Sequence, residues 1–336
     1  MSTAWRQRPE GGGRVAIWLI RAISRYLGRA PARALLYPIT LYFLLRRGPE
    51  RRASRAYLAR TLGRPATLWD VARHIHTFSA TILDRVFLLG DRDMSRFDMR
   101  VSGVDAVRAQ LDEGRGVLLI GSHLGSFEAL RGLAQSRPDI KVRAVLDKSQ
   151  TPAMTQLLEE LNPGVAAGVI DAAQGGLAVT LAIKQATDEG AMVTLLADRV
   201  YPGETVVRAP FLGEAADFPS SPWLIAAALQ VPVSLAFGLY RGGNRYDLVF
   251  ETFSDGIRIE RHHRAQALAG LVARYAQRLE HHARAMPYNW FNFYDFWKHD
   301  DDGSGQAHTA AEANLAAGDS DAARRRLRQQ RALRRA

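Results

Sequence analysis

The chain contains no cysteine, which excludes a disulfide framework, a thiolate zinc site and a cysteine nucleophile. Its nine histidines form no His-Glu-x-x-His pattern, so we expect neither a metal nor a cofactor. It also lacks a Gly-x-Ser-x-Gly elbow, and no Gly-x-Gly-x-x-Gly follows an expected strand. Serine hydrolases of the elbow type and Rossmann-type cofactor enzymes are therefore disfavoured.

The sequence also lacks an apolar run long enough to cross a bilayer, which needs about 20 residues. The apolar run 34–45 is too short, and Arg21, Arg25, Arg29 and Arg33 prevent its fusion with the preceding amphipathic stretch 15–27 into one apolar span. No small-residue cleavage site follows, which weakens a signal-peptide interpretation. Basic and apolar faces together predict helices that lie on an anionic leaflet, with helices packed on the domain as the alternative.

Acidic residues are fewer than basic residues in this sequence. The chain has 336 residues and a formal net charge of +11, carried mainly by arginine. Such a balance implies an anionic partner, which could be nucleic acid, an anionic membrane surface or an acidic protein. No nucleic-acid-binding motif is present, and the basic residues at the N-terminus flank apolar segments. A membrane surface therefore fits better than nucleic acid.

The remainder of the chain alternates between strand-like and helix-like stretches, which predicts an α/β fold whose mostly parallel central sheet is covered by helices. An N-terminal helical region precedes it. The expected strands are 116–121, 142–146, 165–170, 191–197, 231–240 and 246–251. The expected helices include 68–89, 127–134, 153–161, 177–187, 222–229 and 268–285. In such sheets, active groups collect at the carboxyl ends of the strands.

The most informative stretch follows the first buried strand and reads Gly121-Ser122-His123-Leu124-Gly125-Ser126-Phe127-Glu128. On one continuous helix His123 and Glu128 would diverge by roughly 140°, so they meet only if His123 lies before the helix. A carboxylate that holds a neutral imidazole allows it to take a proton from an alcohol. Backbone N–H groups from Ser122 to Gly125 could stabilise an oxyanion. The alternative is a histidine that makes a structural hydrogen bond at a turn.

A second strand, 191–197, ends in Asp198-Arg199. These two charged residues emerge in the same topological situation as His123. They could orient its imidazole, bind a phosphate on a donor, or pair with each other.

The form His-x-Gly-Ser-Phe-Glu resembles the signature of the bacterial lipid A biosynthesis acyltransferases, within the wider group of His-x4-Asp/Glu glycerolipid acyltransferases. Other blocks agree in order and spacing: Gly190 to Val193 before Asp198, then Pro210 to Gly213, Phe218 to Pro222, and Pro287 to Trp290. The resemblance covers roughly residues 14–298. It implies an acyltransferase domain 48–298. Composition and apolar pattern predict the other parts, which are a flexible segment 1–13, membrane-associating helices 14–47 and a disordered basic tail 299–336.

Residue by residue, the resemblance implies that His123 is the general base, Glu128 its orienting carboxylate and Asp198 a functionally important acid. Lys148 and Arg199 would contact an acceptor phosphate or the carrier, beside the turn formed by Ser122 and Gly125. The implied donor is acyl carrier protein or acyl-CoA. The implied acceptor is a glycolipid or phospholipid, at the cytoplasmic face of the bacterial inner membrane, with peripheral or monotopic attachment.

Two departures from the family pattern concern the acceptor. No Arg-Gly occurs near 161–164, and the aromatic ending 290–297 differs from the His-Arg-Arg-Phe ending of lipid A enzymes. Both favour a branch that acts on another glycolipid or a polyene-type lipid. A thioesterase or lipid hydrolase with the same His and Glu, and a membrane scaffold without turnover, remain as alternatives.

Overall fold

Seven strands form the central sheet of the computed structural model, in the order β1-β9-β8-β2-β5-β3-β4. All neighbouring pairs are parallel except β8 and β9, which are antiparallel. This confirms the predicted α/β fold with a mostly parallel sheet. The strands are β1 (Asp98–Ser102), β2 (Val117–Gly121), β3 (Val142–Leu146), β4 (Val169–Asp171), β5 (Met192–Leu196), β8 (Val233–Gly242) and β9 (Arg245–Ser254).

The structure describes residues 28–90, 95–130, 140–149, 152–201 and 203–297. All of them belong to one compact unit, Ala4–Trp297. The expected flexible segment 1–13, the first expected interfacial stretch 15–27 and the basic tail 299–336 lie outside the described residues.

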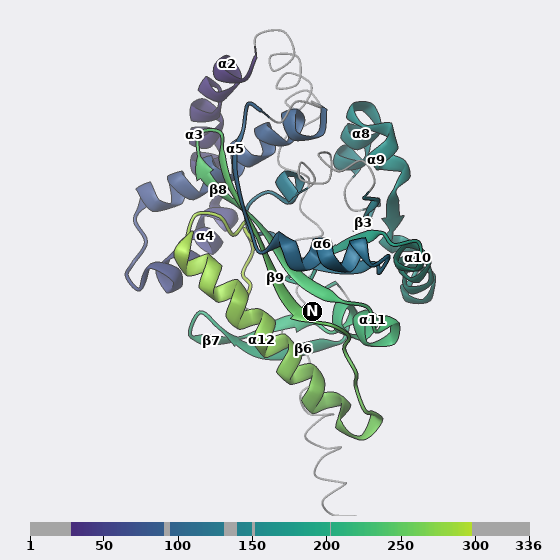
Figure 1. Cartoon of the computed structure of the whole chain (residues 1–336). Coiled ribbons are helices and arrows are strands. Elements are labelled where there is room, and N and C mark those ends of the chain that lie inside the picture. The colour runs from purple at the N-terminus through teal and green to yellow at the C-terminus, as the bar shows by residue number, and fades with distance from the viewer. Residues whose placement is uncertain (1–27, 91–94, 131–139, 150–151, 202, 298–336) are drawn as a thin grey trace, which may run out of the picture. The chain divides into compact units, whose positions relative to one another are not determined.

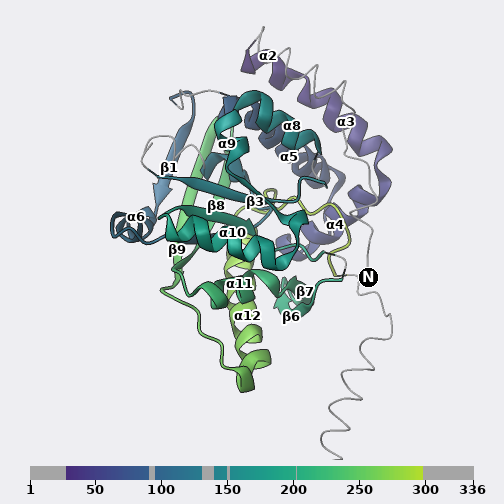
Figure 2. The same ribbon diagram turned by 90° about the vertical axis from the view of Figure 1, so that its right-hand side faces the viewer.

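Helices cover both faces of the sheet (Figures 1 and 2). On β2, Leu118 and Ile120 belong to one apolar core, shared with α10, α11 and α12, whereas Val117 and Leu119 belong to a second core, shared with α2, α5 and α6. The helices are α2 (Arg29–Ala34), α3 (Leu36–Arg46), α4 (Gly48–Leu62), α5 (Leu68–Gly90), α6 (Val104–Asp112), α8 (Pro152–Leu161), α9 (Pro163–Ala167), α10 (Gly176–Asp188), α11 (Ser221–Leu229) and α12 (Arg264–Ala285).

The central strand β2 explains why the site lies where it does. All five of its residues are buried, as expected for a parallel strand covered on both faces. It pairs with β5 in a register that sets Gly121 opposite Leu196. Residues that follow these two strands therefore leave the sheet at the same edge and next to each other.

The structure differs from the sequence prediction in two places. The expected strand 165–170 is instead helix α9 followed by the short strand β4, because Pro163 supplies the fixed φ that suits the first position of a helix. The segment 206–219, where no strand was predicted, forms the hairpin of β6 (Val206–Phe211) and β7 (Glu214–Pro219). Its turn residues Leu212 and Gly213 both have positive φ, as in a type I′ turn.

Ion pairs and hydrogen bonds fasten the N-terminal helices to the sheet. Arg29 of α2 binds both carboxylate oxygens of the buried Asp84 on α5, at 2.7 and 2.8 Å. Arg33 donates to the hydroxyl of Tyr240 on β8 at 2.9 Å. No helix within the described residues is long and apolar enough to span a membrane.

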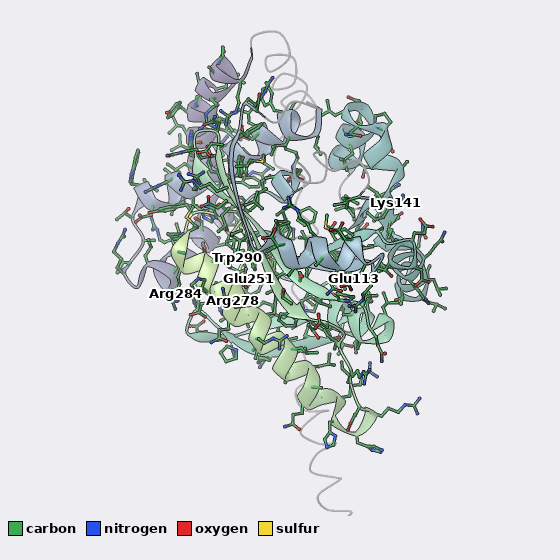
Figure 3. All side chains as sticks on the ribbon, viewed as in Figure 1. Glu113, Lys141, Glu251, Arg278, Arg284 and Trp290 are labelled. Atoms are coloured by element: carbon green, nitrogen blue, oxygen red, sulfur yellow. The ribbon has the colours of Figure 1, made fainter. Side chains whose placement is uncertain are left out.

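On the other face of the sheet, α12 is attached to β9. Arg278 donates two hydrogen bonds to the Glu251 carboxylate, at 2.7 and 2.6 Å, and His282 donates a third at 2.8 Å. Figure 3 shows Arg278 and Glu251 at this contact. The pairing holds the long helix in register with the sheet.

Candidate active site

The segment between β2 and the next helix holds His123 outside regular structure. Helical hydrogen bonding begins at Phe127, so Ser126 takes the position before the helix. Gly125 has φ +78°, and a Cβ atom there would lie 2.0 Å from the carbonyl oxygen of Gly238. Only glycine permits this close approach to β8. Gly125 thus sets the path of the chain that carries His123.

Asp198, at the end of β5, is the hydrogen-bond partner of His123. The imidazole Nδ1 donates to Asp198 Oδ1 at 2.8 Å, and the backbone N–H of His123 donates to Oδ2 at 2.9 Å. The Asp198 side chain is fully buried. Burial alone would raise its pKa, but His123 and Arg199 hold the pKa of Asp198 at about 2. The ionised carboxylate fixes the proton on Nδ1 and leaves Nε2 as the basic nitrogen.

The His123 imidazole is neutral at neutral pH. Its partial burial and the positive charges of Arg199 and Arg85 lower its pKa below the ordinary 6.5, while Asp198 opposes this shift. A neutral imidazole braced by a buried carboxylate is the state that a general base requires.

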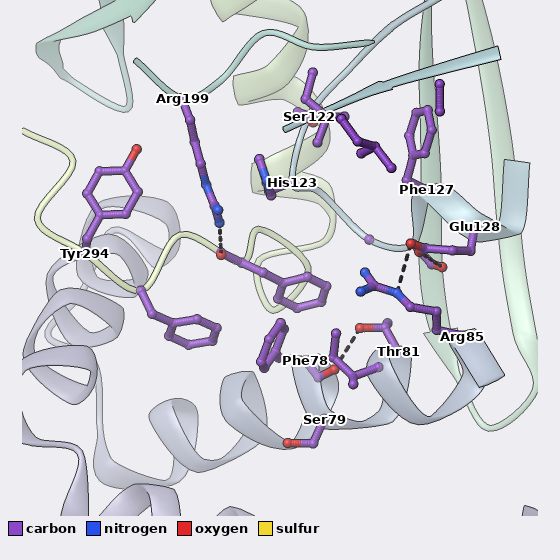
Figure 4. Close-up of a pocket in the computed structure, with 18 of the residues that line it drawn as sticks. Phe78, Ser79, Thr81, Arg85, Ser122, His123, Phe127, Glu128, Arg199 and Tyr294 are labelled. Carbon is purple, nitrogen blue, oxygen red and sulfur yellow. Dashed lines mark hydrogen bonds and ion pairs between the residues drawn. The ribbon is translucent and has the colours of Figure 1, made fainter. Parts of the chain in front are cut away.

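His123 faces a cavity of about 470 Å³, which is a size typical of ligand sites. Figure 4 shows His123 in this cavity together with Arg199, Arg85 and Glu128. Most of the remaining wall is apolar and comes from α3, α5, the helical turn that begins at Phe127, β3, α8, β5 and the segment 291–294: Phe43, Ile75, Phe78, Ile82, Phe127, Ala144, Val145, Leu146, Leu158, Leu195, Leu196, Phe291 and Phe293. A polar reacting centre beside an apolar chamber suits a substrate with a long hydrocarbon part.

Glu128 has a different partner from the one expected. Its Oε1 lies 2.8 Å from Nε of Arg85 on α5, and its Oε2 accepts a hydrogen bond from Ser126 at 3.2 Å. The Nδ1 of His123 forms its hydrogen bond with Asp198 and not with Glu128. In this geometry Asp198 orients the imidazole, and Glu128 fixes a guanidinium in the wall of the same cavity.

The backbone donors expected around Ser122 to Gly125 are largely engaged within the protein. The N–H of His123 donates to Asp198, that of Gly125 to the carbonyl of Asn289 at 2.8 Å, and that of Ser126 to the carbonyl of Gly238 at 2.7 Å. These three groups are therefore not oxyanion donors in this conformation. The cationic side chains that line the cavity next to His123 are better placed for that task.

Of the other expected residues, Arg199, Ser122 and Gly125 line the cavity. Arg199 Nε donates to Asn292 Oδ1 at 2.7 Å, and its NH2 donates to the carbonyl of Phe291 at 3.0 Å. Lys148 follows β3, where its backbone N–H donates to Asp171, and it is not among the residues that line the cavity. Its contact with a substrate stays a prediction.

Sequence reasoning missed Arg85, Trp290 and Asn292. Arg85 lies within a helical segment with no motif around it, so no signal distinguished it. Trp290 and Asn292 lie in the aromatic segment 286–297, where the high aromatic content is a signal that the sequence itself shows. Within the described part of the chain, no group of three or more His, Asp or Glu residues could hold a metal ion.

A family model described as bacterial lipid A biosynthesis acyltransferase matches residues 75–299. This range begins on α5 and includes His123, Asp198 and the aromatic segment. No curated protein matches the chain.

Proposed function

The chain belongs to the bacterial lipid A biosynthesis acyltransferase family and is an acyltransferase that acts on a lipid acceptor, and we propose that His123 is its general base. The single observation that carries this proposal is the Nδ1 bond of His123 to the buried, ionised Asp198, beside an apolar cavity.

The proposed reaction begins with a fatty acyl thioester and a lipid hydroxyl in the cavity. Nε2 of His123 takes the hydroxyl proton as the oxygen attacks the thioester carbonyl. Asp198 stabilises the imidazolium that forms, and the guanidinium of Arg199 stabilises the oxyanion. The C–S bond then breaks, and the imidazolium returns the proton to the thiolate. The products are the acylated lipid and the free thiol, without a metal or cofactor.

We propose acyl carrier protein as the donor, with acyl-CoA as the less favoured choice. Carrier proteins are acidic as a class, and a net charge of +11 favours their electrostatic encounter with this chain. The acceptor is a glycolipid or phospholipid. The aromatic ending of the domain differs from that of lipid A enzymes, which supports an acceptor other than lipid A.

We further propose that the enzyme works at the cytoplasmic face of the bacterial inner membrane, as a peripheral or monotopic protein. The enzymes of this family are associated with that membrane. The exposed apolar residues Tyr37, Leu41 and Leu45 of α3 support contact with the bilayer surface.

The decisive test compares the wild-type protein with His123→Ala and Asp198→Asn. Each is incubated with acyl carrier protein thioester or acyl-CoA and an inner-membrane lipid extract. Thiol release and acylated lipid are measured, the latter by mass spectrometry. We expect His123→Ala to lose activity by at least about a thousandfold, and Asp198→Asn by a similar factor because it fixes the wrong tautomer.

Turnover by His123→Ala at the wild-type rate would remove His123 from its role. Free fatty acid without any acylated lipid would instead favour a thioesterase or lipid hydrolase that uses the same base on water. Absence of turnover in the wild type with every thioester and lipid fraction would favour a scaffold.

A further inference from the structure

The aromatic segment 286–297 lies beside the chain that carries His123. Its residues Asn289 to Phe291 run along residues 123–125. The N–H of Gly125 donates to the carbonyl of Asn289, and the N–H of Phe291 donates to the carbonyl of His123, both at 2.8 Å. The path of the His123 turn is therefore fixed by this segment from one side and by β8 from the other.

Two side chains of the segment end on the carboxylate of Asp198. Trp290 donates its indole N–H to Oδ2 at 2.9 Å, and Asn292 donates its amide N–H to the same oxygen at 3.2 Å. Together with the backbone N–H of His123, three donors converge on Oδ2. The other oxygen, Oδ1, accepts the hydrogen bond from the imidazole Nδ1. This distribution reserves one oxygen for the base and holds the plane of the carboxylate.

The donor side chains are themselves fixed. Oδ1 of Asn292 accepts from Arg199 at 2.7 Å, so the amide nitrogen must be the atom that faces Asp198. The carbonyl of Trp290 lies 2.9 Å from Nε2 of the buried His74, whose Nδ1 lies 2.8 Å from the hydroxyl of Ser54. Trp290 and Asn292 are both at most 1% exposed, so water does not compete for these bonds.

From this geometry we infer that Trp290 and Asn292 are positioning residues of the acyl transfer, which act on the base through Asp198. The inference rests on the proposed role of His123. It gives the aromatic segment a task in catalysis besides packing, since the indole and amide donors point at the one carboxylate that orients the imidazole.

The charged and titratable groups that face Asp198 and His123 determine the expected pH effect. They are His123 itself, Arg199, Arg85, Tyr201, Tyr275 and Tyr294. The tyrosines stay neutral over the range of the experiment because burial raises the pKa of each. Loss of a donor on Oδ2 leaves the negative charge of Asp198 less dispersed, which stabilises the imidazolium and raises the pKa of His123.

The experiment uses Trp290→Phe and Asn292→Leu in the full chain, with Trp297→Phe as the matched control. Trp297 belongs to the same aromatic cluster and donates its indole N–H to the carbonyl of Phe211 at 3.2 Å, so its loss tests packing without touching Asp198. The measurements are kcat, KM and the pH profile of kcat/KM with the thioester and lipid extract used for the wild type, together with Tm.

For each of the two variants we expect kcat to fall about tenfold with KM changed less than about twofold, because a misplaced base affects the transition state more than substrate binding. The acid limb of the profile should move to higher pH. Trp297→Phe should lower Tm to a similar extent yet keep the wild-type kcat and acid limb.

Trp290→Phe and Asn292→Leu profiles that coincide with that of Trp297→Phe would overturn the inference while leaving the role of His123 intact. Activity in His123→Ala would instead overturn the proposed function. If Trp290→Phe does not fold, Asn292→Leu alone decides, because it replaces one side chain by another of similar size. Spectra of the histidine-labelled protein then give the titration of His123 without an activity assay, and an unchanged titration in Asn292→Leu would count against the inference.

Discussion

At the scale of single residues, His123 experiences two opposing influences. Asp198 favours its protonated form, whereas partial burial and the cation of Arg199 favour the neutral form. Burial and the charge of Arg199 outweigh the effect of Asp198, so the pKa of His123 lies below the ordinary value. A base must be neutral to accept a proton, so a lowered pKa extends its working range toward acid.

The first prediction concerns this range. The acid limb of the kcat/KM profile, which reports the free enzyme, should lie below pH 6.5, the ordinary value for histidine. Replacing Arg199 by Met removes the nearby positive charge and should move the limb to higher pH. Arg199→Lys keeps the charge but loses the forked hydrogen bonds, so its limb should stay closer to that of the wild type. Equal limbs in the Met and Lys variants would mean that the charge of Arg199 does not set the pKa of His123.

The residues of the site differ in how far the sequence could predict them. His123 and Asp198 were predictable because each follows a buried apolar run, and parallel strands release such residues at one edge. The partner of Glu128 was not predictable. The helix begins only at Phe127, and Glu128 lies within its first turn, facing Arg85 of α5. A pairing between residues 43 positions apart in the chain has no local signature.

At the scale of elements, the buried strands and long helices were predictable from apolar runs and periodicity, with ends within a few residues. The hairpin β6–β7 was not, because its residues alternate only partly and Pro210 and Pro219 argue against strands. Packing of its apolar side chains stabilises the hairpin. Ala209, Phe211, Ala216 and Phe218 are buried in the core beside α12, and that apolar face is visible only once α12 is in place.

The attachment of α12 to β9 leads to a prediction about stability. Burial alone would raise the pKa of Glu251, but the hydrogen bonds from Arg278 and His282 hold it at about 2, below the ordinary 4.5. A lowered folded-state pKa adds stability above pH 4.5, and this contribution is lost as the pH falls from 4.5 toward 2. Its size is at most about 3 kcal/mol.

The measurement is urea unfolding of the wild type and Glu251→Gln between pH 2 and pH 7. The variant should be less stable at pH 7, and the difference should shrink as the pH falls through this window. Glu214→Gln serves as the control, because Glu214 forms an ion pair with Arg60 while its side chain is 54% exposed. Such surface pairs contribute about 0–1 kcal/mol. A difference for Glu251→Gln that does not vary with pH would contradict the prediction.

At the scale of the whole molecule, the substrate cavity and the proposed membrane contact share one helix. Phe43 of α3 lines the cavity, followed by Arg47 and Glu50 at the start of α4. The outer face of the same helix exposes Tyr37, Leu41, Tyr42 and Leu45, by 71, 54, 55 and 68%. Exposed arginines, Arg46, Arg52 and Arg55, lie nearby in the sequence. An apolar stripe bordered by cations suits an anionic bilayer surface.

The last prediction follows from this arrangement. Replacing Leu41, Tyr42 and Leu45 by Ser should weaken binding to phosphatidylglycerol-containing vesicles by at least about tenfold, because each inserted side chain contributes on the order of 1 kcal/mol or more. Leu177→Ser with Leu181→Ser is the control, since these two leucines of α10 are exposed by 77 and 58% and no arginine occurs in the sequence of that helix. Co-sedimentation of both variants and the wild type, at low and high salt, measures the effect. Residues 14–27 are the same in all three proteins, so a difference between the variants belongs to α3. Equal losses in the two variants would mean that general surface hydrophobicity, and not this helix, attaches the enzyme to its lipid substrate.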